Sequence, residues 1–147
     1  MKTLAAMVVG VVVVGCGAPV TPDTEASELP AATWSGRRGL VFEGVGPIGD
    51  DYQVKTTPGA YHSGTISGLC HQSDSAVEAG LVGDGQFSWA GELACPPVKF
   101  GFCDAVAITF TSVAAYPSDD GLAVFAGGEA IGCGETWPVS FSFVGQR

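Results

Sequence analysis

The sequence predicts an all-β domain, an antiparallel sandwich or a small barrel of about eight short strands, after a signal peptide and a flexible tether. Apolar and polar residues alternate in several windows, and glycine is abundant, at 22 residues. No window of ten residues carries a helical apolar stripe that Gly or Pro does not break. Parallel sheets need long crossovers, which are absent, so we expect neighbouring strands to be antiparallel.

The first element in chain order is an N-terminal leader. Lys2 supplies a positive charge, and the run from Leu4 to Val14 is eleven residues long, apolar and uncharged. A helix needs about 20 apolar residues to cross a bilayer, so this run is too short to span one. We therefore interpret it as a targeting segment and exclude it from the fold.

The leader ends in Val13, Val14, Gly15 and Cys16. This ending resembles the lipobox of bacterial lipoproteins, in which an aliphatic residue, a permissive position and a small residue precede a cysteine. Valine stands here at the first position, where leucine is usual, and at the second, where alanine or serine is commoner. The alternatives are a plain signal peptide with a chance cysteine and an uncleaved N-terminal anchor.

The resemblance implies how Cys16 is processed. Its thiol would receive a diacylglyceryl thioether, a lipoprotein signal peptidase would cut between Gly15 and Cys16, and the new amine would take a palmitate-class acyl chain. Each buried methylene contributes about 0.8 kcal/mol, so two or three such chains hold a protein on a membrane. Because Gly17 rather than aspartate follows Cys16, the sorting rule of enterobacterial lipoproteins favours the outer membrane over the inner one.

The mature chain is strongly acidic. Removing residues 1–15 takes Lys2 away and leaves 132 residues with five Lys and Arg against fifteen Asp and Glu, a net charge of −10. Such a surface repels phosphate backbones, so we expect no nucleic-acid partner. The length suffices for one domain with one core.

The second element is the tether, residues 16–33. After the cysteine it contains three prolines, three acidic residues and few core-forming side chains. This composition is typical of a flexible linker. We therefore expect residues 34–147 to form a single β domain, held off the membrane by the linker.

The remaining elements are strands. Three windows have apolar side chains mostly at alternate positions, which predicts strands with one buried face: 87–95, 106–113 and 139–144. Weaker patterns predict strands at 39–45, 51–56, 60–69, 76–83 and 121–131. Turn signals rich in Gly, Pro, Asp and Ser separate these windows at 46–50, 57–59, 83–85 and 117–121.

Four cysteines follow Cys16: Cys70, Cys95, Cys103 and Cys133. An even number in an exported protein indicates two disulfides. We expect Cys95 to pair with Cys103 across a short loop, and Cys70 to pair with Cys133 between distant strands. A metal site is the alternative, but two cysteines eight residues apart without a Cys-x-x-Cys motif do not fit zinc-ligand spacing. We therefore predict no metal ion and no cofactor.

The sequence predicts no catalytic residues. Residues 44–49 match Gly-x-Gly-x-x-Gly, but a strand rather than a helix follows, which favours a turn over a dinucleotide site. His62 and His71 each stand beside a residue with a nucleophilic side chain, but neighbours in a strand point to opposite faces. The acidic pairs 50–51 and 119–120 lack the alternating acids of a calcium loop, and we expect both in turns.

Aromatic residues supply the candidate binding positions. Trp34 and Trp137 lie near predicted strand ends, where exposure is plausible, whereas Trp89 is expected in the core. We expect a non-enzymatic binding or structural module, anchored to the membrane by lipid, whose partner is an envelope protein or a glycan. One alternative is an envelope-anchored inhibitor of a foreign hydrolase such as lysozyme, by analogy with small lipidated β-barrel inhibitors. A less favoured alternative is a hydrolase.

Overall fold

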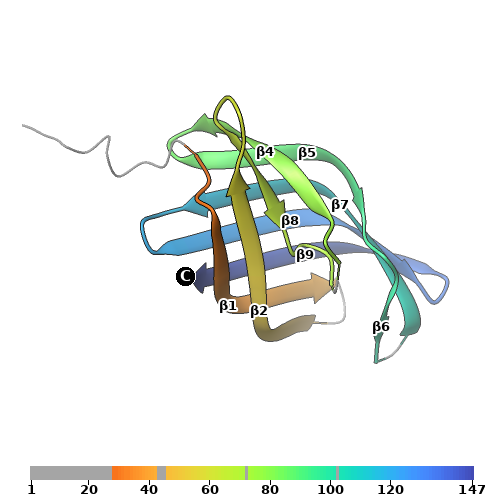
Figure 1. The fold of residues 1–147 in the computed structure, drawn as a ribbon. Coiled ribbons are helices and arrows are strands. Elements are labelled where there is room, and N and C mark those ends of the chain that lie inside the picture. Colours follow the sequence, from red (N-terminus) through yellow and green to blue (C-terminus); the bar gives the residue numbers. More distant parts are fainter. Residues whose placement is uncertain (1–27, 43–45, 72, 102) are drawn as a thin grey trace, which may run out of the picture.

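The computed structural model describes residues 28–147 except 43–45, 72 and 102. Cys16, the leader and most of the predicted linker lie outside these residues. The described chain is all-β and its strands pair antiparallel, as the sequence predicts (Figure 1). The strands are β1 (Ala32–Phe42), β2 (Gly46–Pro58), β3 (Ser63–Ser67), β4 (Ala76–Gly83), β5 (Gln86–Ala94), β6 (Val98–Phe100), β7 (Cys103–Pro117), β8 (Gly121–Gly132) and β9 (Glu135–Gln146).

Eight of the nine described strands close into an up-and-down barrel. Each pairs with its neighbour along the chain, β5 pairs with β7, and β9 returns to pair with β1. The short β6 pairs with β7 near Val106, on the edge that β5 uses further along. Strands β5 and β6 therefore form one interrupted wall of the barrel.

Side chains alternate between the inside and the outside of this barrel, and the inward set forms the core. The core faces predicted for residues 106–113 and 139–144 are confirmed. Their buried side chains are Val106, Ile108, Phe110, Val113, Val139, Phe141 and Phe143. Trp89 is half-buried and packs against this core, as expected.

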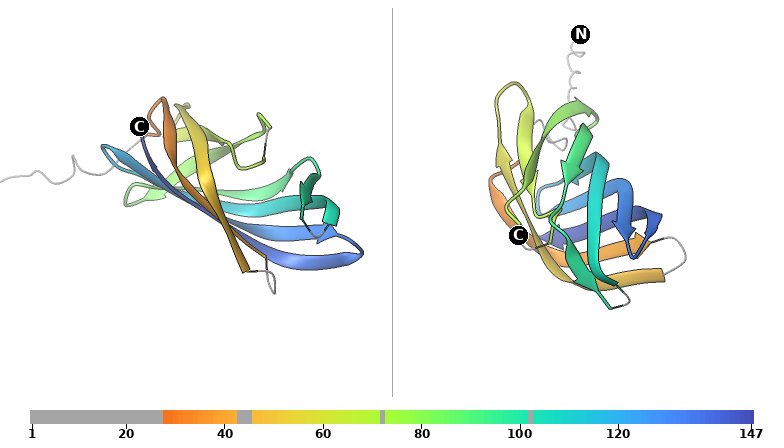
Figure 2. Two further views of the ribbon diagram at one scale, coloured as in Figure 1. Left: turned by 90° about the horizontal axis from the view of Figure 1, so that it is seen from below. Right: turned by 90° about the vertical axis from the view of Figure 1, so that its right-hand side faces the viewer.

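The barrel has two different ends (Figure 2). We call the end at which β1 begins the tether end; it also holds the β2–β3, β4–β5 and β7–β8 turns and the C-terminus. We call the opposite end the open end; it holds the β8–β9 turn and the segments that follow β3 and β5.

The tether end is closed by residues that precede β1. Leu29 is fully buried, and Gly64 makes room for it, since a Cβ there would lie 2.8 Å from Leu29 Cδ1. The indole Nε1 of Trp34 donates to Thr56 Oγ1 (2.8 Å), which donates to the carbonyl of Pro30 (2.6 Å). The prediction that the linker extends to residue 33 is therefore wrong, because the domain already includes Leu29.

The open end lacks part of its wall. Strand β2 is 13 residues long, but β3 has only five and pairs with β2 from Lys55 to Pro58. From Gly46 to Val54, β2 pairs among the described residues with β1 alone. We call the resulting space between β2 and β6 the lateral window; Gly68 and Cys70, which follow β3, lie beside β2 at its margin.

The structure also corrects some predicted turns. Residues 46–50 lie in β2 rather than in a turn, because Gly46 already pairs with Phe42 and Pro47 is tolerated on a strand edge. The acidic pair 50–51 therefore also lies in a strand. The turns at 83–85 and 118–120 are confirmed, and Asp84 has the positive φ of 53° that such a tight turn requires.

Candidate functional site

A cavity of about 180 Å³ lies inside the open end of the barrel. An enclosed apolar space of about 150 Å³ is known to hold a molecule of benzene size, so this cavity fits one small ring or one branched side chain. Its wall is largely apolar, with three basic side chains, Arg38, His71 and Lys99. The lining residues are Arg38, Leu40, Leu69, Cys70, His71, Cys95, Pro96, Val98, Lys99, Phe100, Ile108 and Phe110.

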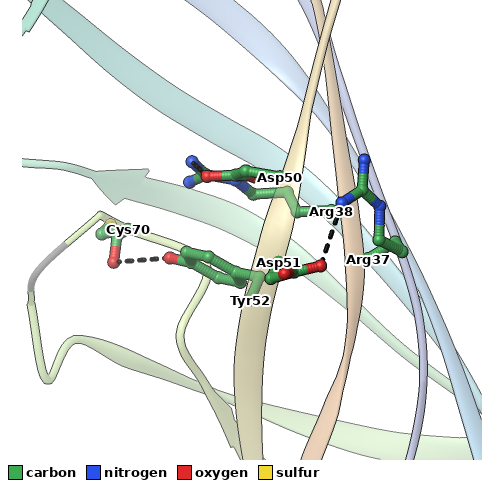
Figure 3. A network of polar contacts seen from close by, with 6 residues as sticks. All are labelled: Arg37, Arg38, Asp50, Asp51, Tyr52 and Cys70. Carbon is green, nitrogen blue, oxygen red and sulfur yellow. Dashed lines mark hydrogen bonds and ion pairs between the residues drawn. The ribbon is translucent and has the colours of Figure 1, made fainter.

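Arg38 is the charged group that is buried at this cavity. It lies on the inward face of β1, and only 8% of its side chain is exposed. Its Nε and Nη2 donate to the two carboxylate oxygens of Asp50 on β2, at 2.9 and 2.7 Å (Figure 3). Such a forked pair fixes the guanidinium plane and offsets the cost of burying its charge.

The ring of Tyr52 supports the same guanidinium from a second side. Arg38 Cζ lies 4.1 Å from the ring centroid, a cation–π contact. The Tyr52 hydroxyl donates to the carbonyl of Cys70 at 3.4 Å, so it links β2 to the chain that follows β3 (Figure 3). Burial raises the pKa of Tyr52 above its usual value of 10.0, and the nearby Arg38 charge offsets part of the rise.

Two disulfides fix the open end, but the predicted pairing is wrong. Cys70 pairs with Cys95, and Cys103 pairs with Cys133. The Cys95 N–H donates to the carbonyl of Ile108, which holds Cys95 on the barrel wall opposite the segment after β3. Cys103 begins β7 beside the β8–β9 turn that carries Cys133. Sequence spacing alone does not carry this three-dimensional information.

A second, open groove of about 820 Å³ lies outside the barrel, next to the cavity. Tyr52 and Cys70 line this groove, and Cys70 also lines the cavity. Its charged residues are Arg37, Asp51 and Asp74. Arg37 and Asp51 form a 2.9 Å ion pair but are 68% and 92% exposed, and Asp74 is exposed as well. Charges that exposed are screened by water, so the cavity is the better candidate site.

The aromatic residues predicted to bind do not form a site. Trp34 is fully buried in the core, since its position falls on the inward face of β1, which begins earlier than expected. Trp137 is half-buried and packs against the core. The two were not predicted as core because β1 and β9 extend beyond the alternating windows in the sequence.

The potential catalytic and metal-binding residues are also scattered. His62 lies in the β2–β3 turn at the tether end, and His71 follows β3 at the open end. Asp50 and Asp51 pair with Arg38 and Arg37 in β2, while 119–120 occupy the β7–β8 turn. Among the described residues, no three His, Cys, Asp or Glu side chains gather in a way that could hold a metal ion.

Arg38 is not among the site residues that the sequence analysis predicts. The signal was present: Trp34, Gly36, Arg38 and Leu40 occupy alternate positions, so Arg38 shares the face of two core residues. An arginine on an apolar face indicates a buried, paired charge. The sequence pattern places its partner Asp50 in a turn, so pairing between Arg38 and Asp50 on neighbouring strands is not predicted.

Comparison of the chain with family models, with curated proteins and with solved structures finds no match. In the part of the chain that the structure describes, no helix has the length and apolar character needed to cross a bilayer.

Proposed function

We propose that this chain is a lipid-anchored protein of the cell envelope whose barrel is a binding module. The observation that carries the proposal is the open-end cavity with the buried guanidinium of Arg38 at its wall. An apolar space with one fixed charged group is the usual composition of a ligand site, because the apolar wall supplies affinity and the charge supplies orientation. The bound group would be a small ring or a branched aliphatic group.

The arrangement of the two ends supports this proposal. The chain enters the domain at the tether end, where Leu29 is buried. A lipid on Cys16 would thus hold the tether end toward the membrane, and the cavity opens at the other end. Both disulfides also lie at the open end, and Cys70 and Cys95 of one of them line the cavity.

The anchor is proposed from the leader, and it places the barrel in the envelope, at the outer membrane rather than the inner. An envelope protein or a glycan remains the proposed partner, with no nucleic acid. We propose no enzymatic activity, because the two histidines lie at opposite ends of β3 and share no site.

Two measurements test the two parts of this proposal. Cells that express the wild type with a labelled fatty acid should yield a labelled protein in the membrane fraction, and Cys16→Ser should lose the label. A labelled Cys16→Ser protein would contradict the anchor.

Cavity binding is tested with toluene as the probe. Toluene that binds only the folded state should raise the melting temperature of the full-length protein. Val98→Trp, at the cavity wall, should abolish this rise, whereas the matched control Val144→Trp, on a side chain that is 63% exposed, should keep it. The same rise in both variants would contradict cavity binding.

One observation favours the inhibitor alternative. Tyr61, in the β2–β3 turn, is 98% exposed, and both Tyr61 and His62 have positive φ values, of 55° and 58°. The turn is braced by bonds from Gly59 N–H to Ser63 and from Leu81 N–H to His62. An exposed aromatic on a preformed loop is typical of an anchor for a protein partner. Full activity of a panel of muramidases and proteases in the presence of the protein would contradict this alternative.

A further inference from the structure

The lateral window exposes one edge of β2. Next to this edge, β3 pairs with β2 only from Lys55 onward. The 2.8 Å hydrogen bond from Gly59 N–H to the carbonyl of Ser63 sets the phase of the β2–β3 ladder. Bond directions alternate along a regular antiparallel strand, so the odd-numbered residues of β2 direct their N–H and C=O groups toward β3 and, beyond it, into the window.

The stretch of edge open to a partner is short and has clear limits. Pro47 is in this phase but has no N–H, which is typical of a strand edge that faces outward. Gln53 is also in phase, but Gly68 lies against it, since a Cβ there would lie 2.8 Å from the Gln53 carbonyl oxygen. Gly49 and Asp51 remain, with two N–H and two C=O groups directed into the window.

We propose that an extended segment of a partner protein adds to this edge of β2 and places one apolar side chain in the open-end cavity. This inference rests on the proposed function and specifies the ligand class. Main-chain groups aligned along a strand edge are recognised by the main chain of another strand. Side chains of an added strand alternate in direction, so one of them faces the barrel interior while its neighbours face outward. The cavity of about 180 Å³ has room for that one side chain.

The charges on β2 favour a basic partner over a second copy of this chain. Two β2 edges that pair antiparallel about Asp51 would bring the Asp51 carboxylate of one copy opposite that of the other. Like charges across a ladder are destabilising, whereas a lysine, arginine or threonine opposite Asp51 is favourable. Asp51 is 92% exposed and its ion pair with Arg37 is exposed too, so a basic residue of the partner can replace Arg37 at little cost. The partner segment is therefore extended and basic, with one ring or branched aliphatic side chain.

The test uses the purified full-length protein and a synthetic peptide in which lysine and threonine alternate and the central threonine is replaced by phenylalanine. We expect the peptide to slow amide hydrogen exchange at Gly49 and Asp51 by about tenfold or more, measured by NMR. The same peptide, N-methylated at those alternate residues whose N–H groups would face β2, cannot donate hydrogen bonds to the edge and should not bind. A peptide with glycine in place of phenylalanine should bind more weakly, and Val98→Trp should remove the advantage of the phenylalanine.

The outcomes separate this inference from the proposed function. Equal binding of the N-methylated peptide, or toluene binding without peptide binding, would overturn strand addition and leave cavity binding intact. Binding of neither probe would overturn both. Protection of Gly49 and Asp51 before any peptide is added would show that another part of this chain already covers the edge, which would also overturn the inference. A thermal melt of Val98→Trp checks that this variant is folded.

Discussion

The guanidinium of Arg38 and the carboxylate of Asp50 form a forked pair inside the barrel, at 2.9 and 2.7 Å. One step along each strand, Arg37 and Asp51 form an ion pair on the outside through a single hydrogen bond of 2.9 Å. The two pairs are neighbours in the β1–β2 ladder and differ in burial and in the number of hydrogen bonds. They therefore form a natural internal comparison.

Asp50→Ala should destabilise the fold much more than Asp51→Ala. Removal of Asp50 leaves the buried guanidinium of Arg38 without its partner, and because Asp50 itself is 41% exposed we expect a loss of about 1–3 kcal/mol, below that for a fully buried pair. Loss of the exposed pair should cost about 0–1 kcal/mol. Urea unfolding of both variants measures the difference. Equal losses would mean that burial of Arg38 does not matter for stability.

Trypsin should separate the two disulfides. Lys99 lies between Cys95 and Cys103, so cleavage after Lys55 and Lys99 gives one fragment with Cys70 and Cys95 and another with Cys103 and Cys133. Under non-reducing conditions, mass spectrometry should find two separate fragments, each with an internal disulfide. Either alternative pairing joins the two fragments, so a single linked species would contradict the structure.

Leu29→Ala should destabilise the domain, although the residue lies before the first strand. Its side chain is fully buried, so truncation should cost about 2–4 kcal/mol through lost burial and a cavity. The control Val144→Ala removes a side chain that is 63% exposed and should stay within about 0.5 kcal/mol of the wild type. Chemical unfolding of both variants measures the two losses of stability. A Leu29→Ala variant as stable as the wild type would show that residues 28–33 belong to the linker.

Tyr52 should make the stability of the barrel sensitive to alkaline pH. Its pKa is raised in the folded state, chiefly by burial, so the folded protein holds the phenol proton more tightly than the unfolded chain does. The stabilising contribution is complete below the unfolded pKa of 10.0 and is lost as the pH rises through the folded pKa. Tyr52→Phe should flatten the fall in unfolding free energy above pH 10, measured by urea titration at several pH values. If the unfolding free energy of Tyr52→Phe falls as steeply above pH 10 as that of the wild type, groups other than Tyr52 cause the loss of stability at alkaline pH.

Much of the fold follows from the sequence because strand alternation is a local signal. Alternate spacing alone predicts the buried face of Val106, Ile108 and Phe110. The same spacing predicts the buried face of Val139, Phe141 and Phe143. Ring closure does not follow, since it depends on the pairing of β9 with β1, whose paired residues lie 97 to 111 positions apart in the chain. A local pattern holds no information about such a contact.

The site was harder to predict than the fold for the same reason. Arg38 and Asp50 were visible as residues, but only the β1–β2 register brings them together. The cavity depends on a missing stretch of wall, which arises because β3 is only five residues long while β2 has 13. The cysteines were correctly expected to form two disulfides, yet their partners depend on how β6 folds back along β7.

The most direct test of the central claim, that the open-end cavity is a binding site, is a methyl NMR titration of the full-length protein with toluene. We expect the methyl resonances of Leu40, Leu69, Val98 and Ile108 to shift together, whereas those of the exposed Val82, Ile131 and Val144 should not shift. Val98→Trp should abolish the shifts of the other three cavity residues. No shift at the cavity, or shifts of equal size on the exposed methyl groups, would contradict the claim.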